Sequence, residues 1–175
     1  MFTFKHKHDA KTTKELYRIL AGKHSTLWTG SNSLIDLAAK NKVLLQLLRT
    51  LNIQGPLRNA QEEAMKRTVH VVGMVSKSLK DYDHAFFKLF KPVNYVPADV
   101  DILVKLDEAT DAAKGIMRLG YKVAIKEPYC LTLTRGRSVI DLYVHPTVGG
   151  TVYLDGQVLL CLLYTSPSPR DRQKS

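Results

Sequence analysis

Two short apolar segments that carry aspartate constrain the fold of this chain more than any other feature. The first reads Asp99-Val100-Asp101-Ile102-Leu103-Val104, and its alternation predicts a β-strand over residues 99–105. Side chains two apart in a strand point to the same side, so Asp99 and Asp101 share one face. Both should be exposed at the start of the strand, while the other face packs on a core. The predicted core-facing residues are Val100, Ile102 and Val104.

The second segment is a strand predicted over residues 139–145, which carries Asp141 in an otherwise apolar sequence. A lone buried carboxylate is costly unless it is paired with a cation or bound to a metal. If the two strands are neighbours in one sheet, Asp141 joins Asp99 and Asp101 in a cluster of three carboxylates. The sequence therefore predicts an acidic site on one face of a sheet.

Such a cluster suits Mg²⁺ or Mn²⁺, which prefer oxygen ligands and commonly share them with substrate phosphates. Two bound cations could activate an attacking hydroxyl and stabilise a leaving pyrophosphate. Two structural alternatives stay open. Asp99 and Asp101 could form a solvated acidic strand end, and Asp141 could form an ordinary ion pair. The basic residues considered as partners for Asp141 are Arg135, Arg137 and Lys105.

The segment before the first aspartates is expected to be helical. Apolar residues at helical spacing predict helices over residues 13–21, 33–51 and 57–79, with Ser33 as an N-cap of the second. Asn52-Ile53-Gln54-Gly55-Pro56 should end the second helix. A buried strand is then expected over residues 84–90, followed by a proline-containing loop.

The part between and after the two acidic strands mixes helix and strand. Asp107 is expected to cap a helix over residues 108–119, which Gly120 closes. Further strands are predicted over residues 121–125, 131–135 and 151–154, with a tight hairpin at Gly136 and a turn at Asp155-Gly156. The residues expected to face inward on the helix are Ala109, Ala112, Ala113, Ile116 and Met117.

The excess of basic residues is confined to the first part of the chain. The 175 residues contain 26 Lys and Arg against 16 Asp and Glu, a formal charge of +10. Residues 1–98 hold 16 bases and 7 acids, whereas residues 99–160 hold 7 and 8. A basic helical flank beside a near-neutral domain is compatible with a nucleic-acid partner. No apolar run reaches the roughly 18 residues of a membrane span, and no secretory segment is evident, so a cytoplasmic protein is expected.

The last fifteen residues differ in character from the rest. Residues 161–171 resemble the translation of a transposase-based sequencing adapter, so residues 161–175 are interpreted as a non-native tail after a truncated domain. The alternative is a disordered tail rich in Ser, Pro and Arg. The predicted organisation is a basic helical segment at residues 1–56, a domain at residues 57–160, and the tail. Without the tail, Cys130 is the only cysteine.

The order of helix, strand, loop, Asp-x-Asp strand, helix, strands and a third aspartate strand resembles the polymerase-beta-type nucleotidyltransferase superfamily. The resemblance covers roughly residues 57–144 and implies an α+β fold, a mixed sheet with helices on one face. It also implies that Asp99 and Asp101 bind the metal ions. Asp141 would be the third carboxylate and would assist deprotonation of the acceptor hydroxyl.

One motif of the superfamily has no counterpart. The Gly-Ser pair that grips the triphosphate would be expected near Phe90-Lys91-Pro92-Val93 and is absent. Lys88 and Lys91 flank the predicted site and could supply charge to phosphates instead. As the alternative, they could be solvated lysines at an edge.

The resulting functional prediction is transfer of a nucleoside monophosphate from an NTP to a hydroxyl acceptor, with Mg²⁺ or Mn²⁺ as cofactor. The basic flank favours a nucleic-acid acceptor. The rival prediction is a catalytically inactive binding or regulatory module, antitoxin-like, that keeps this fold without the Gly-Ser motif.

Overall fold

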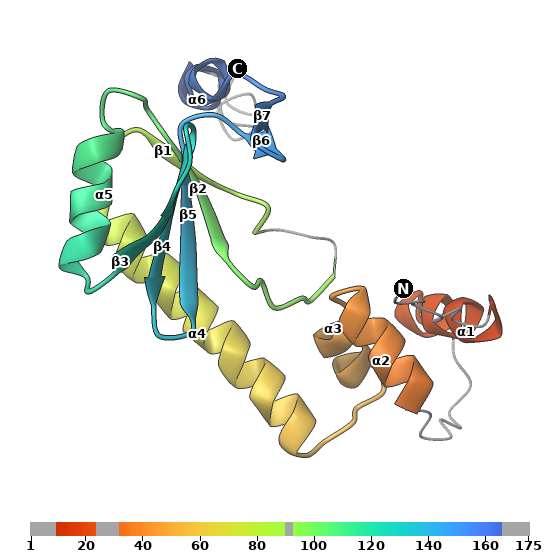
Figure 1. The fold of residues 1–175 in the computed structure, drawn as a ribbon. Helices are drawn as coiled ribbons and strands as arrows, with labels where there is room; N and C mark the ends of the chain where they lie inside the picture. The colour runs from red at the N-terminus through yellow and green to blue at the C-terminus, as the bar shows by residue number, and fades with distance from the viewer. Residues whose placement is uncertain (1–9, 24–31, 90–92, 166–175) are drawn as a thin grey trace, which may run out of the picture. The chain divides into compact units, whose positions relative to one another are not determined.

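A computed structural model describes residues 10–23, 32–89 and 93–165 of the chain (Figure 1). The chain divides into two compact units, and the division falls inside one long helix after Thr68. The described residues before that point, with residues 93–96, form the N-terminal unit. The rest form a unit of mixed α and β structure, which carries the predicted acidic site. The predicted domain boundary, at residue 56, lies at the start of this helix, whereas the division between the two units lies after Thr68.

The N-terminal unit contains three short helices, α1 (Ala10–Leu20), α2 (Asn32–Lys40) and α3 (Leu44–Thr50). The single helix predicted over residues 33–51 is wrong, because the chain turns at Asn41–Val43. Lys42 adopts φ 58°, and the Val43 N–H donates to the Ala38 carbonyl at 2.9 Å, which ends α2. Both helices bury leucines at helical spacing, so their combined apolar pattern predicts one long helix. The buried residues of this unit's core are Leu16, Ile19, Leu34, Leu37, Ala38, Leu44, Leu47 and Leu48.

Helix α4 (Pro56–Ser78) confirms the helix predicted over residues 57–79. Its proline occupies the first helical position, where a missing N–H is harmless. The β-branched residues at its centre are accommodated because Val71 and Val75 bury their side chains against the sheet. The C-terminal half of α4 is therefore held by tertiary packing as well as by its own hydrogen bonds.

The sheet has five strands: β1 (His84–Phe87), β2 (Val100–Val104), β3 (Lys122–Lys126), β4 (Cys130–Arg135) and β5 (Ser138–Tyr143). Their spatial order is β1-β2-β5-β4-β3. Strands β2 and β5 are parallel and adjacent, and the other pairs are antiparallel. The five-stranded mixed sheet confirms the predicted α+β class.

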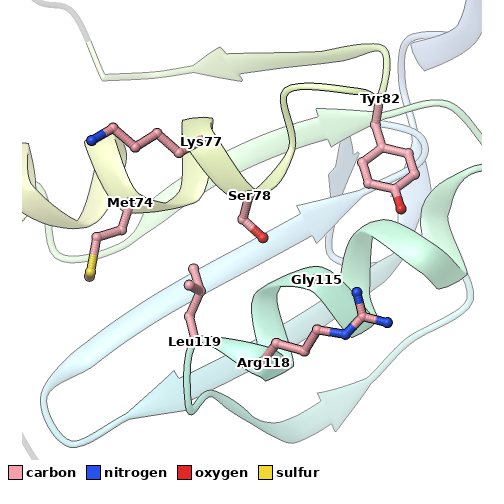
Figure 2. Close-up of a pocket in the computed structure, with 7 residues that line it drawn as sticks. All are labelled: Met74, Lys77, Ser78, Tyr82, Gly115, Arg118 and Leu119. Atoms are coloured by element: carbon pink, nitrogen blue, oxygen red, sulfur yellow. The ribbon is translucent and has the colours of Figure 1, made fainter.

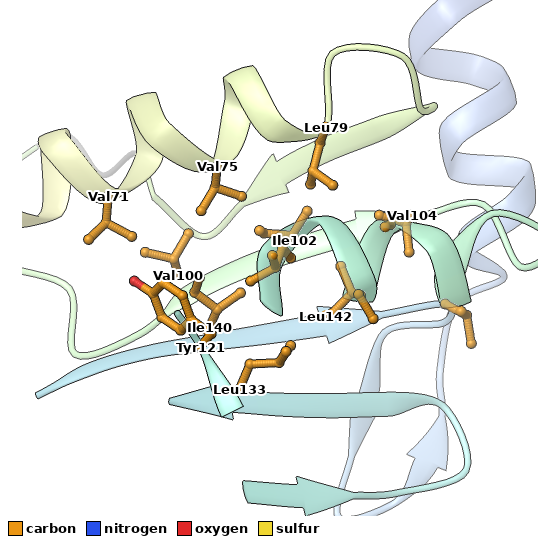
Figure 3. Packing of buried hydrophobic residues seen from close by; sticks show 14 residues of the cluster. Val71, Val75, Leu79, Val100, Ile102, Val104, Tyr121, Leu133, Ile140 and Leu142 are labelled. Carbon is orange, nitrogen blue, oxygen red and sulfur yellow. The ribbon is translucent and has the colours of Figure 1, made fainter. Parts of the chain in front are cut away.

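One face of this sheet is covered by α4 and by α5 (Ala109–Arg118), as Figures 1 and 3 show. The prediction that alternate residues of β2 face a core is confirmed, since Val100, Ile102 and Val104 are all buried there. The fully enclosed partners from other elements include Val75, Leu79, Ile116, Tyr121, Leu133 and Ile140. The remaining residues of each strand point to the other face.

Several local predictions around α5 and β1 differ from the structure. Asp107 does not cap α5: the helix begins at Ala109 after Glu108, and Glu108 accepts the backbone N–H of Asp83 at 2.8 Å instead. Met117 is 44% exposed rather than inward, because the buried stripe of this helix passes through Ala112, Ala113 and Ile116. Strand β1 ends at Phe87 and is only half-buried, since it is the edge of the sheet.

The chain after β5 forms a small hairpin and a helix. Strands β6 (Thr147–Val148) and β7 (Thr151–Val152) pair across Gly149 and Gly150. The turn predicted at Asp155-Gly156 is wrong, because Gly156 begins α6 (Gly156–Thr165). The Asp155 carboxylate accepts the Gln157 N–H at 2.8 Å and so caps this helix. Helix α6 extends over residues 161–165, the start of the segment interpreted as a non-native tail, and its side chains from 161 to 164 are exposed.

Candidate functional site

The two predicted acidic strands are neighbours, and their aspartates lie opposite each other. In the parallel pair β2 and β5, Asp101 is in register with Asp141. Register partners on adjacent strands point to the same face, and adjacent strands lie about 4.8 Å apart. The row continues through Phe87 of β1 on one side and Thr132 of β4 on the other. We call this side of the sheet, opposite α4 and α5, the carboxylate face.

Asp101 is buried, which corrects the prediction that it would be exposed. It is only 5% exposed, and no other charged residue in the described part of the chain is buried to this degree. The strand alternation places it on the predicted face, but neighbouring side chains cover it there. A buried carboxylate needs compensation, so its contacts decide what the site can do.

The compensating group is Lys88. Its Nζ lies 3.0 Å from Oδ1 of Asp101, which makes a charge-assisted hydrogen bond. The same ammonium group lies over two aromatic rings, 4.8 Å from the centroid of Phe87 and 5.1 Å from that of Tyr143. From the sequence, Lys88 was left as a phosphate ligand or as a solvated lysine at an edge; the structure places it beside the edge strand, half-exposed and in contact with the Asp101 carboxylate.

Burial raises the pKa of Asp101 above its ordinary value. The hydrogen bond and the charge of Lys88 oppose that effect, whereas the carboxylates of Asp99 and Asp141 add to it. The net direction is upward, so the ionised form of Asp101 is disfavoured in the folded protein even with Lys88 in place. An additional cation near this carboxylate would favour the ionised form.

Asp141 is held by the neighbouring strand. The Thr132 hydroxyl donates to its Oδ1 at 2.6 Å, which fixes the carboxylate orientation. Two of the basic residues considered as ion-pair partners contact other groups. Arg135 donates to the carbonyl of Leu119 at 2.6 Å, and the Lys105 ammonium lies 3.9 Å from Asp83. The sequence pattern did not point to Thr132, since only the β4–β5 register brings it opposite Asp141.

The third predicted carboxylate, Asp99, lies just before β2 and is half-exposed. It is near enough to influence the pKa of Asp101. Lys91 and the position expected for the Gly-Ser motif fall largely within residues 90–92, outside the described residues. In the part of the chain that the structure describes, no group of three His, Cys, Asp or Glu side chains is arranged to hold a metal ion. The magnesium site therefore stays a prediction.

A hydroxyl and a thiol extend the carboxylate face beyond the aspartates. Tyr143 and Cys130 are register partners on β5 and β4, two residues along from Asp141 and Thr132. Burial is the main cause that raises the pKa of both, to about 11 for Cys130. At neutral pH both groups are protonated, so neither supplies a nucleophile or a base to the site.

A separate cavity of about 360 Å³ lies on the helical side of the sheet (Figure 2). Its lining comes from the last turns of α4, from Tyr82, from α5 and from Leu119 directly after α5, and it includes two basic side chains, Lys77 and Arg118. The helices approach closely beside it, because a Cβ at Gly115 would lie 3.1 Å from the Ser78 hydroxyl. This cavity is on the opposite face from the aspartates and has no part in the acidic site.

Comparisons with protein-family models, with curated proteins and with solved structures gave no match for this chain. Within the described ranges, no helix combines the length and apolar character needed to cross a bilayer.

Proposed function

We propose that the second unit is a divalent-metal-dependent nucleotidyltransferase, which transfers a nucleoside monophosphate from an NTP to a hydroxyl acceptor. The observation that carries the proposal is the register of Asp101 with Asp141 on adjacent parallel strands. Two carboxylates from distant parts of the sequence then share one face of the sheet, and Asp99 lies immediately before β2. An arrangement that brings acidic side chains together against their mutual repulsion is typical of a cation site.

The donor chemistry fits Mg²⁺ or Mn²⁺. All three side chains offer carboxylate oxygens, and Asp101 is buried with its pKa raised by burial, so a cation would offset an existing cost. When bound, such a metal would neutralise charge on the triphosphate and on the departing pyrophosphate. Asp99 and Asp101 would hold it. Asp141, oriented by Thr132, would accept the proton of the attacking hydroxyl.

A nucleic-acid acceptor is the favoured class because of the charge distribution. The basic excess lies in residues 1–98, which hold 16 bases and 7 acids, whereas residues 99–160 hold 7 bases and 8 acids and are close to neutral. Phosphate groups of an acceptor strand would be attracted to the first part. The binding should then weaken steeply as salt is added, which is the signature of phosphate contacts.

One observation favours the rival function, a binding module without catalysis. Lys88 already neutralises Asp101, and the described carboxylates are not assembled as a three-ligand group. A protein that has lost the reaction could retain this ion pair as a purely structural feature. The two functions make different predictions for the same variants.

The test is an assay of labelled nucleotide incorporation from each of the four NTPs, with Mg²⁺ or Mn²⁺ and with RNA, DNA or protein acceptors. The variants are Asp101→Asn and Asp141→Asn, and Asp107→Asn is the control because Asp107 is exposed in the same unit. Transfer should fall by about 10²-fold or more in the first two and be unchanged in the control. Wild-type protein that transfers no nucleotide, but binds an acceptor as tightly as Asp101→Asn does, would favour the binding module.

A further inference from the structure

We propose that Lys88 is an internal counter-cation that competes with the divalent metal for Asp101, so that metal binding displaces the lysine toward the substrate phosphates. This inference rests on the metal site of the proposed function and adds to it a residue that sets metal affinity. It predicts that the ligand-free protein binds metal more weakly than its carboxylates alone would allow.

The two partners of the ion pair differ in their access to solvent. The Asp101 side chain is 7% exposed, whereas the Lys88 side chain is 50% exposed. The carboxylate is fixed in β2, an inner strand of the sheet, while the lysine follows the last residue of the edge strand β1. Solvent therefore reaches the ammonium group more readily than the carboxylate. Of the two, Lys88 is the partner that can be exchanged.

Two aromatic rings position the ammonium group at the carboxylate. The ring centroids of Phe87 and Tyr143 lie 5.3 Å apart in an edge-on contact, and Lys88 Nζ is within 5.1 Å of both. Both rings belong to the carboxylate face, since Phe87 is opposite Asp101 and Tyr143 is two residues from Asp141. Ring faces attract cations in general. The site thus favours a positive charge at Asp101 whether the charge is a lysine or a metal.

The backbone also directs Lys88 into this position. Its φ is 60°, in the left-handed region that residues other than glycine seldom adopt. Such a conformation persists when the surrounding structure holds it, and it often marks a functional position. Here it ends β1 and turns the lysine back toward the neighbouring strand, where the carboxylate lies.

With either cation in place, Asp101 has a positively charged partner. While the metal is absent, Lys88 compensates Asp101, so the buried carboxylate is never left alone. Once the metal occupies Asp101, the ammonium group is released beside the site where the triphosphate is expected. There it would contribute one positive charge, which partly replaces the contacts of the missing Gly-Ser motif.

The experiment measures Mn²⁺ binding to the whole chain by electron paramagnetic resonance and calorimetry, without nucleotide. Lys88→Met keeps the length of the side chain, and Lys88→Gly keeps the backbone conformation while it removes the side chain. Both should bind Mn²⁺ about tenfold more tightly than wild type, or about 1.4 kcal/mol. Lys105→Met is the matched control, since Lys105 is 47% exposed and lies beside Asp83 instead. Its affinity should equal that of wild type.

Asp101→Asn separates the possible failures. If it abolishes Mn²⁺ binding while both Lys88 variants bind no more tightly than wild type, the exchange is overturned and the metal site stands. If no variant binds Mn²⁺, or if Asp101→Asn binds as wild type does, both the exchange and the metal site are overturned. If the Lys88 variants bind more tightly but nucleotide transfer is never detected, the exchange stands and the proposed function fails. Thermal unfolding of each variant verifies that it is folded.

Discussion

Asp101 combines three properties in one side chain: it is buried, it is bonded to the ammonium group of Lys88, and it lies beside a second carboxylate on the same face of the sheet. Residues with such conflicting demands are common at functional sites, where stability is lost in exchange for activity. The cost should be measurable in the ligand-free protein, because it does not depend on any reaction.

Asp101→Asn should therefore raise the thermal midpoint at pH 7 by a few degrees, the scale of about 1 kcal/mol in a chain of this length. Burial raises the pKa of Asp101 in the folded state, so its ionisation lowers stability at every pH above that value. The advantage of the variant should shrink as the pH falls through the raised folded-state pKa toward about 3.9, the ordinary value for aspartate, because Asp101 is then protonated in the folded state and no longer carries the cost of a buried charge. Thermal unfolding followed by circular dichroism measures both.

Asp107→Asn serves as the comparison, since Asp107 is exposed, and its midpoint should match that of wild type. A lower midpoint for Asp101→Asn at pH 7 would mean that the bond to Lys88 outweighs the cost of burial. Asp101 would then be a stabilising residue rather than a costly one.

At the residue level, the sequence was sufficient for the side of the sheet on which each aspartate lies. A strand alternates with period two, so the apolar Val100 and Ile102 fix the direction of Asp101. The contact with Lys88 could not be foreseen. It depends on where β1 ends and on the left-handed backbone of Lys88, and no local pattern encodes either of them.

At the level of elements, α3 is attached to the start of α4 by a charged network. Glu62 accepts two hydrogen bonds from Arg49, at 2.9 and 2.6 Å, and one from Arg58 at 3.0 Å. The bidentate pair with Arg49 lowers the pKa of Glu62 to about 2. Both arginines and the carboxylate lie in the N-terminal unit, so the network stabilises that unit.

Glu62→Gln should lower the free energy of unfolding of this unit at pH 7, because the variant loses the charge that both arginines bind. The folded-state pKa is depressed, so the contribution of Glu62 is complete above about pH 4.3 and is lost as the pH falls through about 2. Urea unfolding of wild type and variant at pH 7 and at pH 2 measures the difference. It should be clear at pH 7 and much smaller at pH 2.

Glu63→Gln is the matched control, because Glu63 is exposed and pairs with Lys66 at the surface. Equal losses from the two substitutions at pH 7 would show that the network has no special role. A loss from Glu62→Gln that persists unchanged at pH 2 would contradict its attribution to charge.

Helix α6 depends on a close approach at its first residue. A Cβ at Gly156 would overlap the carbonyl oxygen of Val144 and lie 2.8 Å from Cδ1 of Leu103. Gly156→Ala should therefore displace the start of α6 and destabilise the protein by about 1–3 kcal/mol. Urea unfolding gives the magnitude, and the hydrogen exchange of α6 amides locates the effect.

Gly73→Ala is the opposite control. Gly73 lies in α4, and a Cβ added there would meet no atom within 4 Å, so alanine should be neutral or stabilise by up to about 1 kcal/mol. If Gly156→Ala proves as harmless as Gly73→Ala, then α6 is not docked where the structure places it.

The helices and strands with one clear period were predictable, and those that meet at a short break were not. Helix α4 and the alternating strands follow from their apolar spacing. The break between α2 and α3 was not predictable from the sequence, because the residue with the left-handed backbone is Lys42 and not a glycine. The start of α6 was not predictable because glycine after aspartate is typical of a turn. Here the glycine is needed for another reason: tertiary packing leaves no room for a Cβ at position 156.

At the level of the whole molecule, the order of the strands decides whether an acidic site exists. Strand β5 inserts between β2 and β4, which places Asp141 beside Asp101 although 40 residues separate them in the chain. The acidic site was predicted only on the condition that the two aspartate strands are neighbours. The sequence alone could not show that they are neighbours, because the alternation of apolar and polar residues in a strand is the same beside any partner strand.

The central claim is that Asp101 and Asp141 act as one site, and a double-mutant cycle tests it most directly. Metal-dependent nucleotide transfer is measured for wild type, Asp101→Asn, Asp141→Asn and the double variant. Residues that act as a unit give non-additive losses. Each single substitution should reduce transfer by about 10²-fold or more, and the double variant should be little worse than either. Single variants that keep wild-type transfer, or losses that simply multiply in the double variant, would contradict the account.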